Sequence, residues 1–295
     1  MRRGAGAALV VGVAHAQSRP AGIAPVCPLC SATASALYAL PHTTAWQCHA
    51  RDCRLRFAAP QAGDADLGAA YRSLYYPGAE HRAAPNCDGT PEAIHAELVR
   101  YLCRVLGGAS QARLLDYGCG RGALAGVAER LGLRVVGIER DPCARASASR
   151  AGRFPVFEDL AQMLRAAPDA SFDAIVMWQV IEHLREPWAD LARLRERLAP
   201  AGCVAIATPN ADSLRARLQR ERWENFANPT HFYYFTKGSL AKIARRAGLE
   251  LVDRPLLPAV YPHHGGVRRF SQRWLRRLEL SGDLVWILRR ATARV

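Results

Sequence analysis

The stretch Arg113-Leu-Leu-Asp-Tyr-Gly-Cys-Gly-Arg-Gly122 decides the fold of this 295-residue chain. Its two leucines indicate a buried parallel strand, three glycines follow in a tight turn, and residues 123–131 have helical spacing. A strand, a glycine loop and a helix N-terminus together form a cradle for a nucleotide-like ligand. The spacing Gly118-x-Gly120-x-x-Ala123 also fits the dinucleotide fingerprint, so the glycines alone leave two ligand classes open.

A carboxylate separates these two ligand classes. Asp116 closes the predicted strand and faces the loop, where a carboxylate would sit badly beside a diphosphate but well beside an ammonium or sulfonium group. S-adenosylmethionine carries both of these cations. Glu139 ends the next predicted strand, at the distance where a carboxylate accepts hydrogen bonds from ribose hydroxyls in either class of cofactor.

The segment Asp116-Tyr-Gly118-Cys-Gly120-Arg-Gly122 resembles the first motif of the class I S-adenosylmethionine-dependent methyltransferases, Asp-x-Gly-x-Gly-x-Gly. The resemblance implies an α/β fold, a Rossmann-like doubly wound sheet of seven strands with the last strand antiparallel. It also implies S-adenosylmethionine as the cofactor, held by Asp116, the three glycines and Glu139. A bare phosphate loop or a structural turn is the alternative.

A second motif lies in residues 171–184, Ser-Phe-Asp-Ala-Ile-Val-Met-Trp-Gln-Val-Ile-Glu-His-Leu. Its apolar run predicts a central parallel strand, and Gln179 and His183 follow at the end where open α/β sheets bind ligands. The string resembles the family's Phe-Asp…Glu-His-Leu motif. We place Gln179 beside the cofactor and His183 as a base that removes a proton from the acceptor, because an imidazole titrates near neutral pH. A packed structural histidine is the alternative.

Two further matches complete the predicted site. The acid before Leu160 resembles the family position that contacts the adenine amino group, which favours Asp159 over Glu158; a solvated turn acid is an equally good interpretation. The aromatic and polar stretch 223–236 resembles the segment that borders the acceptor pocket in one branch of the family. It offers His231 as a second candidate base, against ordinary loop packing.

Two cysteine pairs near the N-terminus predict a small zinc ribbon. Cys27-Pro-Leu-Cys30 and Cys48-His-Ala-Arg-Asp-Cys53 supply four thiolates, which suit a closed tetrahedral structural site. The second spacing is longer than usual, so His42 or His49 could replace one ligand, and a degenerate ribbon without metal is the alternative. The odd total of nine cysteines, spread along the chain, indicates a reducing compartment, so we expect a cytoplasmic protein.

The chain divides into four expected parts. Residues 1–24 form a disordered or signal-like extension, 25–60 the ribbon-like segment, 61–90 a helical linker or lid, and 91–295 the methyltransferase domain. As a lid, residues 61–90 would place Tyr71, Tyr75 or Tyr76 over the cofactor. Residues 255–281 form a basic helical insertion. The first sixteen residues have the form of a secretory signal, which conflicts with the cytoplasmic assignment, and we treat them as an extension or a mis-assigned start. No apolar run reaches the length of a transmembrane helix.

The net charge of +14 is concentrated after residue 210. It suggests an anionic partner, such as a phosphorylated small molecule, a nucleic acid or an acidic membrane surface, or else only solvated helix faces. The ribbon and the histidine-rich loop resemble enzymes that methylate small molecules such as sugars, quinone precursors and secondary metabolites on oxygen or carbon. We therefore predict methyl transfer from S-adenosylmethionine to a small-molecule acceptor. An RNA methyltransferase and an NAD-binding oxidoreductase are the alternatives.

Overall fold

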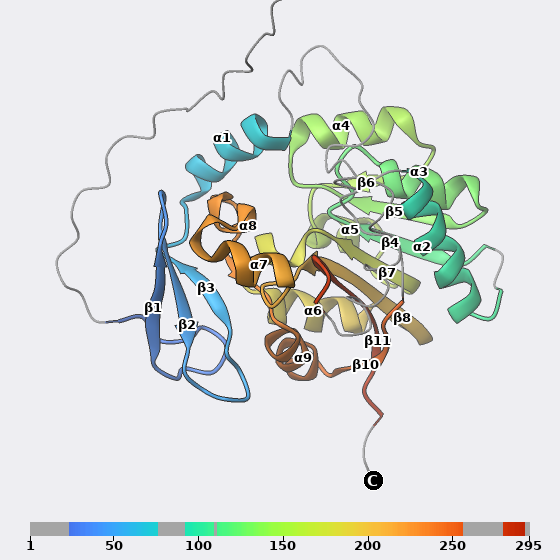
Figure 1. Ribbon diagram of the computed structural model, residues 1–295. Helices are drawn as coiled ribbons and strands as arrows, with labels where there is room; N and C mark the ends of the chain where they lie inside the picture. The colour runs from blue at the N-terminus through green and yellow to red at the C-terminus, as the bar shows by residue number, and fades with distance from the viewer. Residues whose placement is uncertain (1–23, 76–91, 109–110, 256–279, 293–295) are drawn as a thin grey trace, which may run out of the picture.

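The largest feature of the fold is a seven-stranded sheet (Figure 1). The computed structural model describes residues 24–75, 92–108, 111–255 and 280–292. Across the sheet the strand order is β10-β11-β8-β7-β4-β5-β6. The strands are β4 (Arg113–Tyr117), β5 (Arg134–Ile138), β6 (Val156–Phe157), β7 (Phe172–Trp178), β8 (Leu198–Pro209), β10 (Leu249–Asp253) and β11 (Asp283–Arg290). Only β11 runs antiparallel to its neighbours, which confirms the predicted Rossmann-like sheet with an antiparallel last strand.

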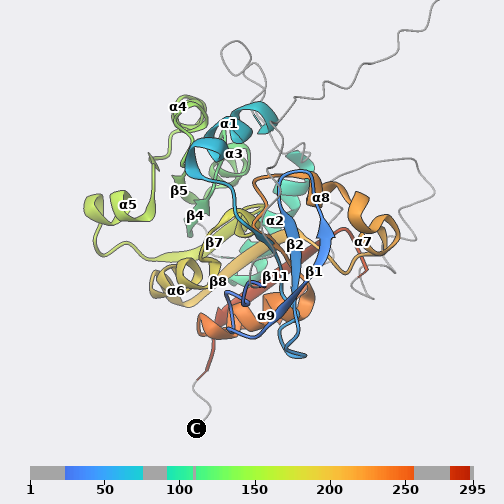
Figure 2. The same cartoon turned by 90° about the vertical axis from the view of Figure 1, so that its left-hand side faces the viewer.

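Helices cover both faces of this sheet (Figure 2). One face carries α2 (Glu92–Val105), α3 (Ala123–Arg130) and α4 (Pro142–Ala151), and the other carries α5 (Leu160–Ala166), α6 (Pro187–Glu196) and α9 (Lys237–Arg246). In β7 the side chains alternate between the two cores: Ala174 and Val176 pack on the α2–α3 side, whereas Ile175 and Met177 pack on the α6–α9 side. Burial on both faces explains why this strand is apolar without a break from Ala174 to Trp178.

A second, smaller sheet is built mainly from the cysteine-rich segment. It has the order β1-β2-β3-β9, with β1 (Ala34–Ala39), β2 (Thr44–Cys48), β3 (Arg56–Ala59) and β9 (Tyr233–Tyr234), and every neighbouring pair is antiparallel. Phe57 and Tyr233 of this sheet pack in the same core cluster as α6 and α9, whereas Ala45, Ala58 and Tyr234 pack in a smaller cluster with Trp223 and Phe226. The edge strand β9 therefore comes from a part of the chain that is far in sequence from the other three strands of this sheet.

The remaining described helices lie in the connections between these layers. They are α1 (Asp64–Tyr75), η1 (Ile181–His183), α7 (Leu214–Gln219), η2 (Arg220–Arg222) and α8 (Glu224–Ala227). Residues 1–23 of the predicted extension 1–24, residues 256–279 of the predicted insertion 255–281, and Tyr76 lie outside the described residues. The side chains of Tyr71 and Tyr75 lie outside them as well. Among the helices that the structure describes, none is both long and apolar enough to span a membrane.

Candidate active site

A pocket of about 640 Å³ lies at the carboxyl ends of the parallel strands β4, β5 and β7. The glycine loop forms its floor, with backbone φ angles of 82° at Gly118, 55° at Gly120 and 84° at Gly122. These angles are in the left-handed region, which favours glycine. A Cβ atom at Gly118 would also meet Cγ2 of Val180 at 2.5 Å, so this position has no room for a larger side chain unless Val180 shifts.

Glu139 is fixed against the same loop by two backbone hydrogen bonds. Its carboxylate accepts from the amide N–H of Gly120 and from the amide N–H of Asp141, both at 2.8 Å. Burial raises its pKa, and the bonds from the two amides oppose this rise. A carboxylate has about four lone-pair sites, so hydrogen bonds from a ligand's hydroxyl groups remain available to it.

The other predicted cofactor residues line the same pocket, except Gly122, which lies at the start of α3. Asp116 is 2 % exposed at the end of β4. Asp159 caps α5, because its Oδ1 accepts a hydrogen bond from the amide N–H of Gln162. One oxygen of this carboxylate thus has a structural role, and the residue also lines the pocket. Gln179 has φ 56° and donates from Nε2 to Asp283 at 3.3 Å, which ties the end of β7 to β11.

The charge of the pocket is opposite to that of the chain. Although the protein carries +14, the pocket is lined by more than twice as many carboxyl as guanidinium groups. The acidic residues are Asp64, Asp116, Glu139, Asp141, Glu158, Asp159, Glu182, Glu186 and Asp190, and the arginines are Arg121, Arg140, Arg185 and Arg193. Such a lining favours a cationic ligand over a diphosphate.

His183 lines the same pocket, and its tautomer follows from its neighbours. Asn228 Oδ1 accepts from both the amide N–H (3.0 Å) and the hydroxyl (2.8 Å) of Thr230. The Thr230 hydroxyl has therefore used its proton, so its oxygen and the Thr230 carbonyl both act as acceptors toward His183 Nδ1, at 3.0 and 2.9 Å. The proton of His183 sits on Nδ1, and Nε2 carries the lone pair that a general base needs. Burial lowers the pKa of His183 to about 4, so the ring is neutral near pH 7.

His231 uses its ring nitrogens inside its own loop. With Oδ1 of Asn228 directed at Thr230, the Asn228 amide group donates from Nδ2 to His231 Nε2 at 3.0 Å. The backbone carbonyl of Asn225 accepts from the other ring nitrogen and opposes the lowering of the His231 pKa by burial. The lone pair of His231 is thus occupied, and the residue is 6 % exposed.

Glu182 is a buried acid between the two histidines and the sheet. It is 1 % exposed, and Oε2 accepts from the Thr208 hydroxyl at 2.9 Å. Its Oε1 has no hydrogen-bond partner among the described residues. Burial raises the pKa of Glu182 to about 8, so the neutral acid predominates at neutral pH.

A metal ion could be considered at Glu182, His183 and His231, whose ligand atoms lie within 4.8 Å of one another. The hydrogen bond from Asn228 occupies the lone pair of His231 Nε2, which leaves at most two ligands as the loop is folded. Two ligands do not make a closed protein site for a transition metal.

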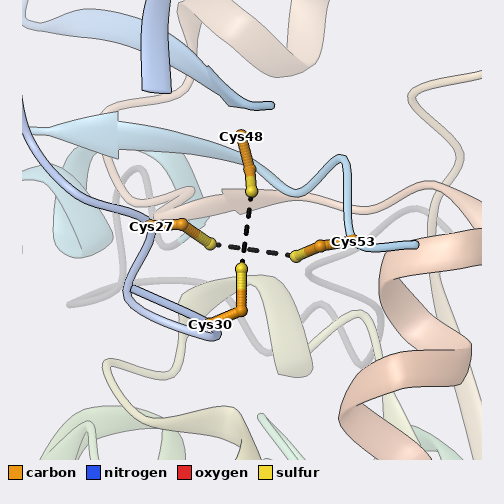
Figure 3. A group of neighbouring side chains, drawn as sticks. All are labelled: Cys27, Cys30, Cys48 and Cys53. Carbon is orange, nitrogen blue, oxygen red and sulfur yellow. Dashed lines mark hydrogen bonds between the residues drawn. The ribbon is translucent and has the colours of Figure 1, made fainter. Parts of the chain in front are cut away.

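The four predicted cysteine ligands come together in the ribbon (Figure 3). The Sγ atoms of Cys30 and Cys48 are 3.5 Å apart, those of Cys27 and Cys53 are 3.8 Å apart, and all four lie within 4.8 Å of one another. A tetrahedral zinc with bonds of ~2.3 Å places its sulfur atoms roughly 3.8 Å apart, so the cluster fits zinc. Neither His42 nor His49 belongs to the group. The residues that follow each pair, Ser31 and Arg54, both have positive φ, so the longer second spacing closes with the same kind of turn.

Two residues of the site were not singled out from the sequence. Asn228 and Thr230 set the tautomers of both histidines, and their side chains form one hydrogen-bonded chain with them. The stretch Asn-Pro-Thr-His at 228–231 carried a signal for a tight loop, because Asn side chains commonly bond the backbone two residues later. Nothing in the local sequence connects this loop to His183.

A family model described as "Methyltransferase domain" matches residues 90–254, which is more than half of the chain. The chain belongs to this methyltransferase family. The ubiquinone biosynthesis O-methyltransferase of Cereibacter sphaeroides is 32 % identical over 152 residues, which are 48 % of this chain and 62 % of the relative. The enzyme of that name from Xanthomonas axonopodis pv. citri is 32 % identical over 157 residues, 48 % of this chain and 64 % of the relative. The matches thus span less than two thirds of the length of these curated relatives.

Solved structures of methyltransferases share the fold. The 1,6-didemethyltoxoflavin-N1-methyltransferase of Burkholderia thailandensis aligns with a TM-score of 0.53 and 22 % identity, covering 83 % of this chain and 99 % of that structure. The CcbJ methyltransferase of Streptomyces caelestis aligns with a TM-score of 0.51 and 18 % identity, covering 75 % of this chain and 96 % of that structure. At this level of identity the likeness supports the fold of the methyltransferase domain.

Proposed function

We propose that this protein transfers the methyl group of S-adenosylmethionine to a hydroxyl oxygen of a small-molecule acceptor, with His183 as the general base. The observation that carries the proposal is the acidic pocket on a glycine loop in a strongly basic chain. A sulfonium and an ammonium group gain Coulomb energy beside Asp116, whereas the two phosphates of NAD would lose it. Family membership and the pocket charge therefore point to the same cofactor.

Different residues of the pocket would bind different parts of the cofactor. Asp116 would face the cationic methionine part and Glu139 the ribose hydroxyls, while Asp159 would accept from the adenine amino group. Bound there, S-adenosylmethionine supplies a methyl group that its sulfonium has already activated. The protein then has to align the acceptor in line with that methyl group and take up a proton.

His183 is the better of the two candidate bases. Its Nδ1 proton is held by Thr230, which leaves the lone pair on Nε2, and its low pKa keeps the ring neutral. A base of low pKa removes a proton most readily from an acidic hydroxyl, such as that of a phenol or enol. His231 instead holds the loop in place through Asn228.

The acceptor class is inferred from the relatives and from the walls of the pocket. The curated relatives are named O-methyltransferases, which favours oxygen over carbon as the methylated atom. The apolar residues that line the pocket include Trp178, Phe232 and Leu67, and apolar walls with a few polar groups suit a small organic molecule. The guanidinium of Arg185 already bonds Asp64 and the Ala62 carbonyl, so the pocket favours a neutral acceptor over the anionic one considered from the net charge.

Calorimetric titration with S-adenosylmethionine, S-adenosylhomocysteine and NADH tests the proposal. We expect the first two to bind and NADH to bind weakly or not at all. Asp116→Asn should weaken S-adenosylmethionine binding by about tenfold or more, because a desolvated charge pair is lost. Asp169→Asn, at an exposed turn away from the pocket, is the matched control. Tight binding of NADH without binding of S-adenosylmethionine would overturn the proposal.

A further inference from the structure

Two cysteine knuckles, residues 27–30 and 48–53, join the ribbon to the catalytic region. Arg246 of α9 donates to the backbone carbonyl of Leu29, between the first two cysteines, and Lys242 of α9 pairs with Asp52, beside the last one. The guanidinium of Arg246 also lies 5.2 Å from the ring centroid of Trp188 on α6. Both knuckles are therefore docked on a helix that packs on the large sheet.

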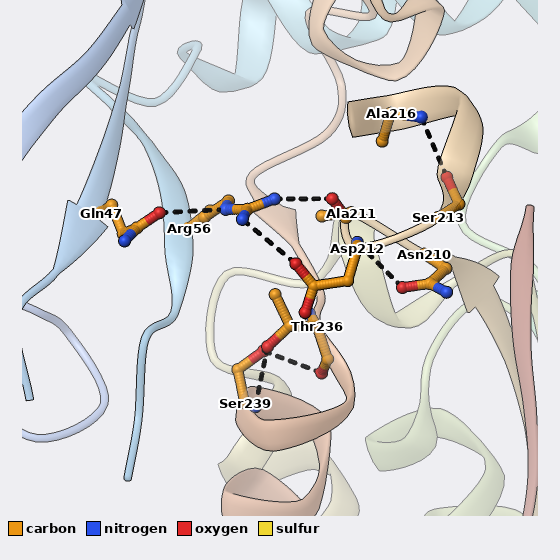
Figure 4. Close-up of polar contacts among 9 residues, drawn as sticks. All are labelled: Gln47, Arg56, Asn210, Ala211, Asp212, Ser213, Ala216, Thr236 and Ser239. Atoms are coloured by element: carbon orange, nitrogen blue, oxygen red, sulfur yellow. Dashed lines mark hydrogen bonds and ion pairs between the residues drawn. The ribbon is translucent and has the colours of Figure 1, made fainter. Parts of the chain in front are cut away.

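The side chain of Arg56 connects strand β3 to residues that follow β8 (Figure 4). Arg56 on β3 donates to Gln47 of β2 at 3.2 Å and reaches across to the Ala211 carbonyl at 2.6 Å and to Asp212 at 3.1 Å. Residues 211–212 directly follow β8. Burial lowers the pKa of Arg56, and Asp212 opposes this change, as is usual for a largely buried ion pair.

The opposite edge of β3 pairs with β9, and the pairing continues into the active site. The Ala58 amide donates to the Phe232 carbonyl at 2.9 Å, and the Phe232 amide donates to the Glu182 carbonyl at 2.8 Å. One peptide segment thus bridges the ribbon and the turn that carries His183. Tyr233 adds a second bridge, since its hydroxyl donates to the Arg185 carbonyl at 2.7 Å.

The segment that forms this bridge also contains Thr230, two residues before Phe232. Thr230 is 0 % exposed, and its carbonyl and hydroxyl are the two acceptors for the Nδ1 proton of His183. A displacement of Phe232 would move these acceptors, and His183 would lose the bond that fixes its ring and its tautomer.

We propose that the ribbon is a positioning element of the active site: strand β3 holds Phe232, and through it Thr230, where Thr230 orients His183. Zinc bound by the four cysteines would make this support rigid. The inference rests on the role proposed for His183 in methyl transfer. In this reading Thr230 and Ala58 are positioning residues, because they act on the reaction through His183.

The test uses two changes at different points of the bridge. Ala58→Pro removes the N–H that bonds Phe232 and leaves the cysteines in place, while Ala58→Gly keeps that N–H and is its control. Cys48→Ser breaks the cysteine cluster, and Cys143→Ser, at an exposed cysteine on α4, is its control. Each variant is measured for zinc content, for calorimetric binding of S-adenosylhomocysteine, for kcat and KM, and for ¹⁵N chemical shifts of labelled histidine rings. The His183 signals are identified by their loss in His183→Asn.

We expect Ala58→Pro and Cys48→Ser to lower kcat by about tenfold or more, in line with the loss of a supporting contact, and to change S-adenosylhomocysteine affinity by less than about threefold. The His183 ring should change from one tautomer, protonated at Nδ1, to a mixture of two. Both controls should resemble the wild type in every readout. The inference is overturned if Cys48→Ser, despite its loss of zinc, or Ala58→Pro keeps the kcat and the His183 tautomer of the wild type. It is also overturned if kcat and cofactor binding fall equally, because that result indicates general unfolding. Should the wild type methylate no acceptor, the proposed function fails, while the tautomer readout still decides whether the ribbon positions His183.

Discussion

The rings of His183 and His231 lie edge to face, with centroids 4.7 Å apart and an interplanar angle of 73°. Asn228 and Thr230 lie between them in the hydrogen-bonded chain, and both histidines carry their proton on Nδ1. His183 keeps the proton on Nδ1, toward Thr230, whereas His231 has its Nε2 lone pair bonded by Asn228. We propose separate tasks for these two neighbouring imidazoles, His183 in proton removal and His231 in the structure of its loop.

The first prediction concerns this pair. His183→Asn should lower kcat by roughly 10²- to 10⁴-fold, the usual loss when a general base is removed, without weakening S-adenosylhomocysteine binding. His231→Asn should lower the melting temperature and reduce kcat by a smaller factor, because its ring holds the loop. Steady-state kinetics and thermal unfolding of both variants check this. A larger loss of kcat in His231→Asn, with unchanged stability, would make His231 the base instead.

The pH dependence of kcat/KM follows from the same site. A base works in its neutral form, so activity that depends on His183 is present above its pKa and is lost as the pH falls through about 4. We therefore expect no inflection near the ordinary imidazole pKa of about 6.5. A profile with its acidic limb near that value would show that His183 is more solvated than in this structure.

The second prediction concerns Gly118. Gly118→Ala should weaken S-adenosylhomocysteine binding by about tenfold or more, because its Cβ would meet Val180 and the backbone φ of 82° is unfavourable for alanine. Gly132→Ala is a matched control, since Gly132 has φ 89° but nothing within 4 Å of its Cβ. Adding Val180→Ala to Gly118→Ala should restore part of the affinity. Calorimetry on the four proteins separates the clash from the backbone strain, and equal losses in the two glycine variants would rule out the clash.

The third prediction concerns the buried acid Glu182. Because its folded-state pKa is raised to about 8, its protonated form contributes stability that is fully present below the unfolded pKa near 4.5 and is lost as the pH rises toward 8. Glu182→Gln is neutral at every pH and removes this dependence. The stability of the wild type relative to the variant should thus fall with rising pH, by up to about 1.4 kcal/mol per pH unit. Urea unfolding at mildly acidic and mildly alkaline pH measures the difference, and a difference that grows with pH would contradict the assignment.

The fourth prediction concerns the cysteine cluster. Protein purified under reducing conditions should contain about one zinc per chain, bound by four cysteines. A strong chelator should remove it, expose four thiols to a thiol reagent and lower the melting temperature, because so small a segment depends on its metal. Cys27→Ser should do the same without chelator, while Cys143→Ser should keep its zinc. Zinc in substoichiometric amount, with the same stability before and after chelation, would favour the degenerate ribbon.

The fold could be predicted from the sequence because its signals are local. The glycine loop, the apolar run from Ala174 to Trp178 and the turn after it each lie within about fifteen residues, and both the strand and the loop formed where expected. The Cys27-x-x-Cys30 pair was equally local. The longer spacing before Cys53 left His42 and His49 open as ligands, and only the structure brings Cys53 to the other three cysteines.

The rest of the site could not be predicted because it depends on contacts between distant residues. Thr230 meets His183 across 47 residues, and Phe232 meets Ala58 across an even longer separation. No periodicity or motif records such pairings, so the choice between His183 and His231 stayed open. Asp159 shows the same limit: the sequence left a solvated turn acid and an adenine contact as alternatives. In the structure one of its oxygens caps α5, which was not predicted, and the residue also lines the pocket.

The pairing of β3 with β9 also has a consequence for biosynthesis. A ribosome completes β1, β2 and β3 early, yet the edge of this sheet stays open until Tyr233 and Tyr234 have been made. Contacts so distant along the chain form slowly. One edge of β3 therefore stays unpaired until most of the remaining polypeptide has been synthesised. Early capture of zinc by the cysteines would shield this segment from aggregation during that interval.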